Sequence, residues 1–479
     1  MAYLIGLDLG TSVTKGILID HKGFVIASER SGTKYIRSDD GKVEFDAEEY
    51  YVQVAAVIKK LVSSLPDNSR IEAICMSSAS GNTVLLDRGQ PFIPAISWLD
   101  SRVKNETDLV LGDPDPHAIY RTVGWPYIKQ FPLAHLCWLN IHMPDTLKKA
   151  SFICMSTDYI NYRLTGRFGM DHSTATTFYL QDQEQKNWNS VLLAKLGIKK
   201  TQLPSLHPSG HLLGDVNESA ALETGLKPGT KVILGSFDHP SAARGSRVSY
   251  ISQLLISCGT SWVGLYPLGS REEGIKRNML VDPFTSSDSN GLYAGMFSIP
   301  AIGEKIDSFV SEFISRDKNK YAEFDKLASQ SPPGANGVII DPMAEFDKKY
   351  LSQYSKSDLS RAVMEGTAYL LKSKIDDFSK SGLRISSATM VGGPADTMPW
   401  PQIVADVLKM DISIINGQHA GAFGAAILAG IGSRIYSNLE DAYSKILFKE
   451  IKRIPEKRSA NIYEQKYEEF LRRKKNKEG

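Results

Sequence analysis

Several features are scarce in this chain of 479 residues, and each scarcity excludes a class of protein. The 4 cysteines are scattered, without the C-x-x-C spacing of redox or zinc sites and at too low a density for a disulfide scaffold. No cluster of histidine and cysteine has metal-ligand spacing, so zinc is not expected. We therefore expect a reduced, cytoplasmic protein.

Long apolar runs and a charge imbalance are also missing. No run of about 18 apolar residues and no signal-like N-terminus is present, so nothing argues for export or membrane insertion. The net charge of +2 gives no reason to expect nucleic acid or a membrane surface as a partner. The remaining composition, 42% hydrophobic and 23% charged, is typical of a globular protein whose length predicts two domains.

A pattern of elements occurs twice along the chain. Residues 3–9, 13–20 and 24–31 read as three strands with a tight turn after the first, and an amphipathic helix follows over 45–62, with Asp46 as its N-cap. Residues 253–258, 262–267 and 291–299, with a helix near 303–314, repeat this order. Gly-Thr-Ser stands at the first turn of both copies, which predicts two related α/β domains, 1–247 and 248–479, with their turns facing one cleft.

The two turns have the chemistry of a phosphate site. Glycine, threonine and serine present backbone N–H groups and hydroxyls, and they let a phosphate approach closely. One such turn fits an ordinary hairpin as well, but two matched turns favour phosphate. Asp8 precedes Gly10 by two residues, whereas Ser257 has that position before Gly259. One carboxylate acting through Mg²⁺ and one turn that only donates would together hold a nucleoside triphosphate.

The chain resembles the FGGY carbohydrate kinases, within the larger group that shares the architecture of actin, Hsp70 and hexokinase. The resemblance rests on "GLDLGTSVTKGILID", "ISCGTSWV", "MVGGPADTMPWPQIVADVLKMDI", "GAFGAAILAGIG" and "VILGSFDHPSAARGS", and it runs from Tyr3 to Gly432. It implies an α/β protein of two ribonuclease-H-like domains that flank a cleft and close over a sugar and ATP–Mg²⁺. The implied activity is transfer of the γ-phosphate of ATP to a sugar hydroxyl.

Two carboxylates carry the predicted chemistry. Asp238 ends the predicted strand 231–238, and from the sequence alone it could equally be a helix N-cap. The match of Gly235 to Asp238 with the G-x-x-D element of the family favours a general base that also contacts the sugar. Asp8 is assigned to Mg²⁺ and to orientation of the phosphates.

The resemblance also implies a set of nucleotide contacts. Lys15 either approaches the phosphates or is a surface lysine on the second strand. The other predicted contacts are Gly10, Thr11 and Ser12 in the first turn, Gly259, Thr260 and Ser261 in the second, Gly303 at the following helix, and Gly392, Gly393, Pro394 and Ala395 at the adenosine segment.

Two segments depart from the family pattern. Pro394 and Asp396 stand where the family usually has a third glycine and a basic or polar residue, and we expect Asp396 to face away from the triphosphate or to cap the next helix. In "VIIDPMAEFDKKY", residues 338–350, Glu345 and Lys348 or Lys349 stand near the usual Gly-Glu-Arg. We expect these departures to affect the affinity for the nucleotide, whereas Asp8, Asp238 and both turns keep the family pattern.

The sugar is predicted from two further elements. Ser80, Gly81 and Asn82 occupy the positions of Met-His-Gly in xylulokinases, and they either bond sugar hydroxyls or form an ordinary turn. The Arg-Glu of glycerol kinases is absent there, which argues against glycerol, and D-xylulose is the best single guess.

The second sugar element, 98–102, resembles the W-x-D-x-R of the family. Trp98 is a sugar platform or a core residue, and Asp100 is predicted to contact a sugar hydroxyl. Arg102 is a second contact or the ion-pair partner of Asp100.

Other readings remain at this point. An actin- or Hsp70-like nucleotide switch would need a large further domain, and the roughly 47 residues after Gly432 are too few for one. A catalytically weak sugar-binding regulator on the kinase fold is motivated by Pro394 and Asp396, although the intact Asp238 speaks against it. A homodimer is an expectation from the family alone.

Overall fold

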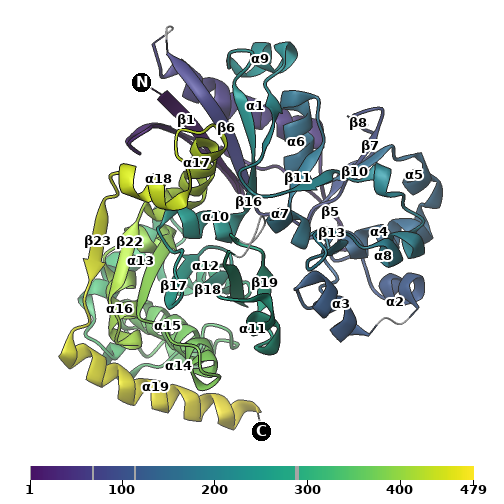
Figure 1. Ribbon diagram of the computed structural model, residues 1–479. Helices are drawn as coiled ribbons and strands as arrows, with labels where there is room; N and C mark the ends of the chain where they lie inside the picture. Colours follow the sequence, from purple (N-terminus) through teal and green to yellow (C-terminus); the bar gives the residue numbers. More distant parts are fainter. Residues whose placement is uncertain (1, 67–68, 113–114, 286–290, 479) are drawn as a thin grey trace. The chain divides into compact units, whose positions relative to one another are not determined.

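The computed structural model describes residues 2–66, 69–112, 115–285 and 291–478 (Figure 1). The chain forms two compact units that interleave in sequence. The first unit contains residues 1–247, 268–295 and 419–448, and the second contains 248–267, 296–418 and 449–479. Division of the chain into two domains at residue 247 stays a prediction.

The first unit is built on a mixed sheet of six strands in the order β15-β16-β6-β1-β2-β3. Strands β1, β2 and β3 form an antiparallel meander, β6 and β16 run parallel to β1, and β15 is antiparallel to β16. The bounds are β1 Ala2–Leu9, β2 Val13–Asp20, β3 Val25–Gly32, β6 Arg70–Ser78, β15 Leu212–Asp215 and β16 Lys231–Phe237.

Helices cover both faces of this sheet. Alternation along β1 sends Ile5 and Leu7 into a core cluster with α1 (Ala47–Ser63), and Leu4 into a second cluster with α17 (Ala420–Gly432). The predicted N-cap of α1 is confirmed, because the carboxylate of Asp46 accepts the N–H groups of Glu48 and Glu49. Figure 1 shows α17, in yellow, beside the purple strand β1, although the two are far apart in sequence.

The second sheet repeats this pairing pattern with seven strands in the order β19-β20-β18-β17-β21-β22-β23. Strand β17 pairs antiparallel with β18 and parallel with β21, β22 follows in parallel, and β23 closes the edge in antiparallel. The predicted repetition of two α/β halves is confirmed. The bounds are β17 Gln253–Cys258, β18 Trp262–Leu268, β19 Leu280–Asp282, β20 Tyr293–Ile299, β21 Ser387–Gly392, β22 Ile412–Ile415 and β23 Glu450–Arg453.

The remaining elements surround these sheets. Shorter strands lie within the first unit: β4 Ile36–Arg37, β5 Val43–Phe45, β7 Val84–Asp87, β8 Gln90–Pro91, β9 Ala95–Ile96, β10 Phe152–Cys154, β11 Gly169–Asp171, β12 Gln181–Asp182, β13 Asn187–Trp188 and β14 Ser205–His207. Its other helices are α2 Glu106–Leu111, α3 Pro116–Val123, α4 Pro132–His142, α5 Pro144–Lys149, α6 Ser156–Thr165, α7 His172–Thr176, α8 Ser190–Leu196, α9 Glu218–Thr224, α10 Asp238–Gly245, α11 Arg271–Lys276 and α18 Leu439–Lys445.

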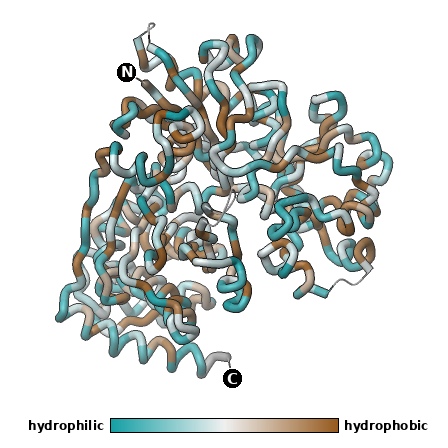
Figure 2. The backbone as a smooth tube through the Cα atoms, in the orientation of Figure 1, coloured by the Kyte–Doolittle hydropathy of each residue, from teal (hydrophilic) through white to brown (hydrophobic). Residues whose placement is uncertain are grey.

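The helices of the second unit include one long amphipathic helix at the C-terminal end. In α19 (Lys457–Glu478), Tyr463, Tyr467 and Phe470 are buried at three- and four-residue spacing. Figure 2 shows the same alternation of hydrophobic and hydrophilic residues along this helix. The other helices are α12 Ile302–Phe309, α13 Lys320–Gln330, α14 Lys348–Leu351, α15 Lys356–Lys380 and α16 Pro399–Leu408.

Candidate active site

Asp8 is the penultimate residue of β1, two residues before the first Gly-Thr-Ser turn. Ser77 on the neighbouring strand β6 donates a hydrogen bond of 3.2 Å to its Oδ1. The carboxylate lies against Gly421 of α17, where a Cβ atom would stand only 2.6 Å from Oδ2. A side chain at residue 421 would therefore displace Asp8.

Asp238 is the first residue of α10, at the carboxyl end of β16. Its Oδ1 accepts the N–H of His239 at 2.6 Å, and Nε2 of the same histidine is 3.7 Å from Oδ1. The side chain of Asp238 keeps 24% of its surface exposed. The carboxylate of Asp238 is therefore partly buried and keeps an open face toward solvent.

The two carboxylates converge on one end of the first sheet. Burial raises the pKa of Asp238 to about 7, against the effect of the backbone hydrogen bonds that it accepts. Burial, and then the charge of Asp238, raise the pKa of Asp8 to about 6, while Lys15 and Ser77 lower it. Both groups are therefore more easily protonated than an ordinary aspartate, because burial disfavours the charged form of each and the charge of Asp238 adds to this effect at Asp8.

Lys15 faces Asp8 across the first turn. The antiparallel register of β1 and β2 pairs Asp8 directly with Lys15, so both side chains stand on the same face of the sheet. Its charge lowers the pKa of Asp8. This position belongs to the carboxylate cluster rather than to a remote surface of the strand.

Thr11 in the first turn is held by two aromatic side chains. Nε1 of Trp98 donates to Oγ1 of Thr11 at 3.0 Å, and the hydroxyl of Tyr35 donates to the Thr11 carbonyl oxygen at 2.8 Å. A hydroxyl has one proton and two lone pairs. Because the indole occupies a lone pair of Oγ1, the proton of Thr11 is left for another acceptor. Ser12 beside it is exposed.

A pocket in the first unit adjoins this turn. It joins the first turn to the segments that the sequence assigns to the sugar, and its wall carries hydroxyl, amide and aromatic groups. The lining residues are Leu9, Gly10, Thr11, Thr33, Tyr35, Phe45, Tyr50, Ser78, Ala79, Asn82, Ser97, Trp98 and Ser156.

The Ser80–Asn82 segment is already hydrogen-bonded within the first unit. Oγ of Ser80 is 2.8 Å from Oγ of Ser78. The amide of Asn82 donates to Oγ of Ser156 at 3.1 Å and accepts the Ser156 N–H at 2.7 Å. At Gly81, φ is +92° and a Cβ would stand 2.5 Å from the ring of Phe131. The aromatic ring fills the space that a histidine would need.

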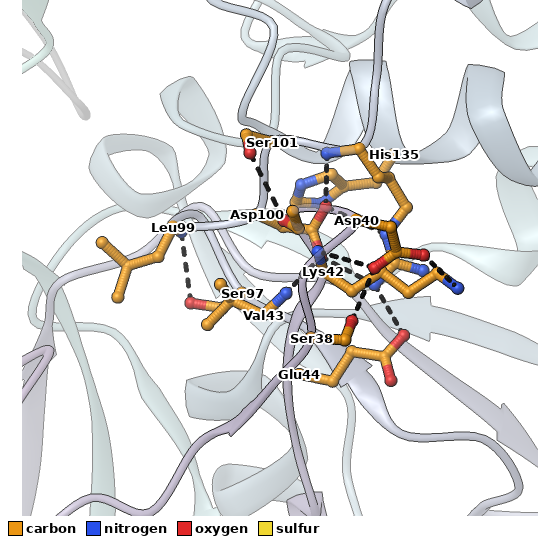
Figure 3. A network of polar contacts seen from close by, with 12 residues as sticks. Ser38, Asp40, Lys42, Val43, Glu44, Ser97, Leu99, Asp100, Ser101 and His135 are labelled. Atoms are coloured by element: carbon orange, nitrogen blue, oxygen red, sulfur yellow. Dashed lines mark hydrogen bonds and ion pairs between the residues drawn. The ribbon is translucent and has the colours of Figure 1, made fainter.

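Asp100 belongs to a buried polar network, and Figure 3 shows its side chain beside Val43. Its side chain is 0% exposed. One oxygen accepts the Val43 N–H at 2.7 Å, and both oxygens accept bonds from the guanidinium of Arg102 at 2.7 and 2.9 Å. Glu44 binds the same guanidinium. The ion-pair alternative for Arg102 is the one observed, and the predicted sugar contact from Asp100 conflicts with this burial.

The second turn is braced by the start of α12 in its own unit. The N–H of Gly303 donates to the Thr260 carbonyl at 2.9 Å, and the N–H of Ala301 donates to Oγ of Ser261 at 3.2 Å. A Cβ on Gly303 would stand 2.5 Å from the Gly259 carbonyl oxygen, so glycine is required there. Gly259 and Thr260 are exposed. That the two turns face one cleft stays a prediction.

The adenosine segment follows β21. Gly392 has φ of +97° and lies against the Cys258 carbonyl, whereas the space in front of Gly393 is open within 4 Å. Pro394 is half-buried and Ala395 is buried.

Asp396 does not cap the next helix, because Met398 is the N-cap of α16. The capping alternative is therefore wrong. The carboxylate of Asp396 instead packs against Gly417, where a Cβ would stand 2.0 Å from Oδ1.

Comparison with known families decides the kind of protein. The N-terminal domain of the FGGY family of carbohydrate kinases matches residues 3–245, and the C-terminal domain of that family matches residues 254–433. This chain belongs to the FGGY family of carbohydrate kinases. It is therefore an ATP-dependent sugar phosphotransferase, and the actin- or Hsp70-like switch is set aside.

Relatives of this FGGY kinase act on different substrates. It is 26% identical to a xylulose kinase of Staphylococcus xylosus, over 92% of this chain and 93% of that protein. It is also 26% identical to an autoinducer-2 kinase of Salmonella paratyphi A, over 98% and 93% of the two chains. The structure of a xylulose kinase from Rhodospirillum rubrum superposes with a TM-score of 0.83 at 25% identity, covering 98% of this chain and 97% of that one.

Some residues at the site of this FGGY kinase escaped the sequence prediction. His239, Ser77 and Tyr35 contact Asp238, Asp8 and Thr11 respectively. His239 could have been found from its place beside the proposed base, but Tyr35 lies in a segment without a motif. Within the described residues, no helix is both long and apolar enough to cross a membrane.

Proposed function

We propose that this FGGY kinase transfers the γ-phosphate of ATP to a hydroxyl of a ketopentose or a related sugar or polyol, with D-xylulose as the best single candidate. One observation carries the proposal. Asp8 and Asp238 converge beside a Gly-Thr-Ser turn whose threonine is bonded to the wall of the adjoining pocket. Phosphoryl transfer to an alcohol needs this combination of an acid–base carboxylate, phosphate donors and an acceptor pocket.

Asp238 is proposed as the general base. Its pKa of about 7 is near that of a group that accepts a proton at neutral pH and releases it afterwards. In the step, the sugar hydroxyl oxygen bonds to the γ-phosphorus and its proton passes to the carboxylate of Asp238. The bond from the γ-phosphorus to the bridging oxygen breaks, and ADP leaves with that electron pair.

Asp8 is proposed as the Mg²⁺ residue. Mg²⁺ prefers a few carboxylate oxygens together with water and phosphate oxygens. The two partly buried carboxylates fit this preference, because each has a raised pKa that a nearby cation would lower again. When bound, Mg²⁺ would neutralise charge on the β- and γ-phosphates. Asp8 would orient it from the end of β1.

The phosphates are proposed to be held by both turns. Thr11 has its proton free for a phosphate oxygen, and Lys15 stands across from Asp8 with a positive charge. The remaining proposed contacts are Gly10 and Ser12 in the first turn, Gly259, Thr260, Ser261 and Gly303 in the second unit, and Gly392, Gly393, Pro394 and Ala395 at the adenosine.

The sugar is proposed to occupy the pocket beside the first turn, in reach of Asp238. Trp98 lines this pocket with its ring, and aromatic rings suit the apolar face of a sugar. Asn82 also lines it, and Ser80 and Gly81 form its supporting segment. Asp100 and Arg102 are proposed to support Trp98 from within rather than to contact the sugar, since they bind each other.

The test is ADP release by the purified chain with ATP and Mg²⁺. Pentuloses, hexuloses and polyols are supplied one at a time, and Asp238→Asn is the matched control. We expect release only with one sugar class, strongest with D-xylulose, and release about 10²- to 10⁴-fold slower from the control. Sugar binding without ADP release would support a regulator on the kinase fold instead. Release with another sugar alone would replace D-xylulose and leave the kinase proposal intact.

Three coarser expectations accompany this proposal: a domain boundary near residue 247, a cytoplasmic location, and a homodimer. Light scattering on the purified chain measures its mass, and twice the 52.9 kDa of one chain supports the dimer.

A further inference from the structure

Residues 236 and 237, directly before Asp238, are each tied to the same remote segment. The N–H of Phe237 donates to Oγ of Ser173 at 3.1 Å, and Oγ of Ser173 donates to Oδ2 of Asp282 at 2.7 Å. Ser173 lies in α7, and Asp282 ends β19. The hydroxyl of Ser173 thus links the end of β16 to the carboxylate of Asp282, which lies in the second half of the sequence.

A second path joins the same two places. Nη1 of Arg244 donates to Oγ of Ser236 at 2.9 Å, and Nη2 donates to the carbonyl oxygen of Phe284 at 2.5 Å. The guanidinium also lies 4.6 Å from the centroid of the Phe284 ring. Arg244 is in α10, the helix that Asp238 begins, so strand end, helix and segment 282–284 form one linked group.

This group is polar but excluded from water. Asp282 is 0% exposed, Ser173 is 1% and Arg244 is 3%. Within the described parts of the chain, Oδ1 of Asp282 has no hydrogen-bond partner. Burying a carboxylate and a guanidinium costs free energy that apolar side chains of the same volume would not cost. Stability is therefore a poor reason for these residues to be here.

Electrostatics bind the group together. Burial raises the pKa of Asp282 to about 7, and the charge of Arg244 opposes that rise. Asp171, the N-cap of α7, lies close enough to affect the same carboxyl. The carboxylate of Asp282 and the guanidinium of Arg244 attract each other in a dry site, so a displacement of either group weakens that attraction.

We propose that Ser173, Asp282 and Arg244 are positioning residues that hold the end of β16 so that Asp238 faces the acceptor hydroxyl. The inference rests on the proposed role of Asp238 as base. The direction in which Asp238 projects follows from the backbone of Phe237 and Ser236, and both are anchored here. A displacement of about 1 Å at a reacting group can lower turnover by about 10²-fold.

The first test compares Ser173→Ala with Ser246→Ala. Ser246 is an equally buried serine at the other end of α10, whose hydroxyl donates to the carbonyl oxygens of Ala242 and Ala243 in its own helix. We expect kcat of Ser173→Ala to fall about 10- to 100-fold with KM for sugar and ATP within about twofold. Ser246→Ala should have a similar Tm and nearly normal kcat. Normal kcat in Ser173→Ala, or an equal fall in both variants, overturns the inference.

A double-mutant cycle gives the second test. In Asp282→Ala the hydroxyl of Ser173 loses its acceptor, so kcat should fall, and the variant Ser173→Ala/Asp282→Ala should be no more than about threefold slower than the slower single variant. If the fold-losses in kcat of the two single variants multiply in the double variant, Ser173 and Asp282 act independently, and the inference is overturned. If Asp282→Ala does not fold, Ser173→Ala alone decides. A wild-type chain without sugar-dependent ADP release, or an Asp238→Asn variant of full activity, refutes the proposed function instead.

Discussion

Nε1 of Trp98 donates a hydrogen bond of 3.0 Å to Oγ1 of Thr11. This bond connects the wall of the proposed sugar pocket with the turn proposed to hold the phosphates, within a single unit of the protein. It directs the threonine proton away from the indole. A sugar that packs against Trp98 would therefore also steady a phosphate donor.

Removing this bond should weaken ATP binding more than turnover. Trp98→Phe keeps an aromatic ring but loses the N–H, and we expect KM for ATP to rise about 3- to 10-fold, the effect of one hydrogen bond. Steady-state kinetics at saturating sugar measure it. Trp188→Phe is the matched control, because the buried indole of Trp188 donates to the Pro204 carbonyl, away from the turn. Equal effects from both variants contradict the coupling.

Loss of the proposed base should affect turnover alone. Asp238→Asn keeps the size of the side chain and the acceptor for the His239 N–H, so binding of sugar and ATP should change little. We expect kcat to fall about 10²- to 10⁴-fold. Calorimetric titration with each substrate checks binding. A variant with near-normal kcat removes Asp238 from this role.

The pH profile should report the carboxylate pair. Asp238 must be deprotonated to accept the hydroxyl proton, and burial raises its pKa to about 7. Activity should therefore rise from pH 5 to pH 8, about tenfold per unit below the apparent pKa. Because Asp8 and Asp238 interact, the profile reports values of the pair. A kcat/KM for sugar that is flat from pH 5 to pH 8 contradicts this prediction.

The same pKa shift should make Asp238 costly for stability above neutral pH. In the folded chain its pKa is about 7 and in the unfolded chain about 4, so the folded state binds more protons between these values. The stabilisation from the bound proton is complete below pH 4 and is lost as pH rises through 7. Asp238→Asn should raise Tm by about 1–3 °C at pH 8.

Scanning calorimetry at pH 8 and pH 4 checks this sign. At pH 4 both the wild-type carboxyl and the amide are neutral in the folded state, so the two Tm values should nearly coincide. Ser77→Ala serves as the control, because it removes a polar contact of Asp8 without removing a titrating group. A lower Tm for Asp238→Asn at pH 8 would refute the prediction.

Asp100 should prove structural. Replacing it by alanine removes one of the two carboxylates that pair with the buried guanidinium of Arg102 within the described residues, and Glu44 remains. Breaking a buried pair in this way costs about 3–5 kcal/mol. Thermal unfolding of Asp100→Ala should show the loss, while kcat/KM for sugar of the folded fraction at low temperature stays within about threefold. A large rise in KM for sugar with unchanged Tm would restore Asp100 as a sugar contact.

Local pattern was enough to predict much of the first unit. Strands β1, β2 and β3 and the capped helix α1 follow from periodicity, from Asp46 and from the turn at residues 10–12, all of which act over a few residues. The repeat of the strand-turn-strand order in the second half of the sequence predicted strands β17, β18 and β20 of the second sheet. Asp8 and Asp238 could be predicted because each lies in a recognisable motif near the carboxyl end of a strand.

The sequence by itself determined the two α/β halves, the two turns and the candidate carboxylates, because neighbouring residues decide these features through backbone geometry. Only the tertiary structure decided that the carboxylate of Asp100 pairs with Arg102. It also decided that the ring of Phe131 fills the space at Gly81. The bonds from Phe237 to Ser173 and from Ser173 to Asp282 likewise appear only in the folded chain. Each of these contacts joins residues that no spacing rule relates. Packing of distant segments sets which polar groups meet in the dry interior, and so which ones remain for a ligand.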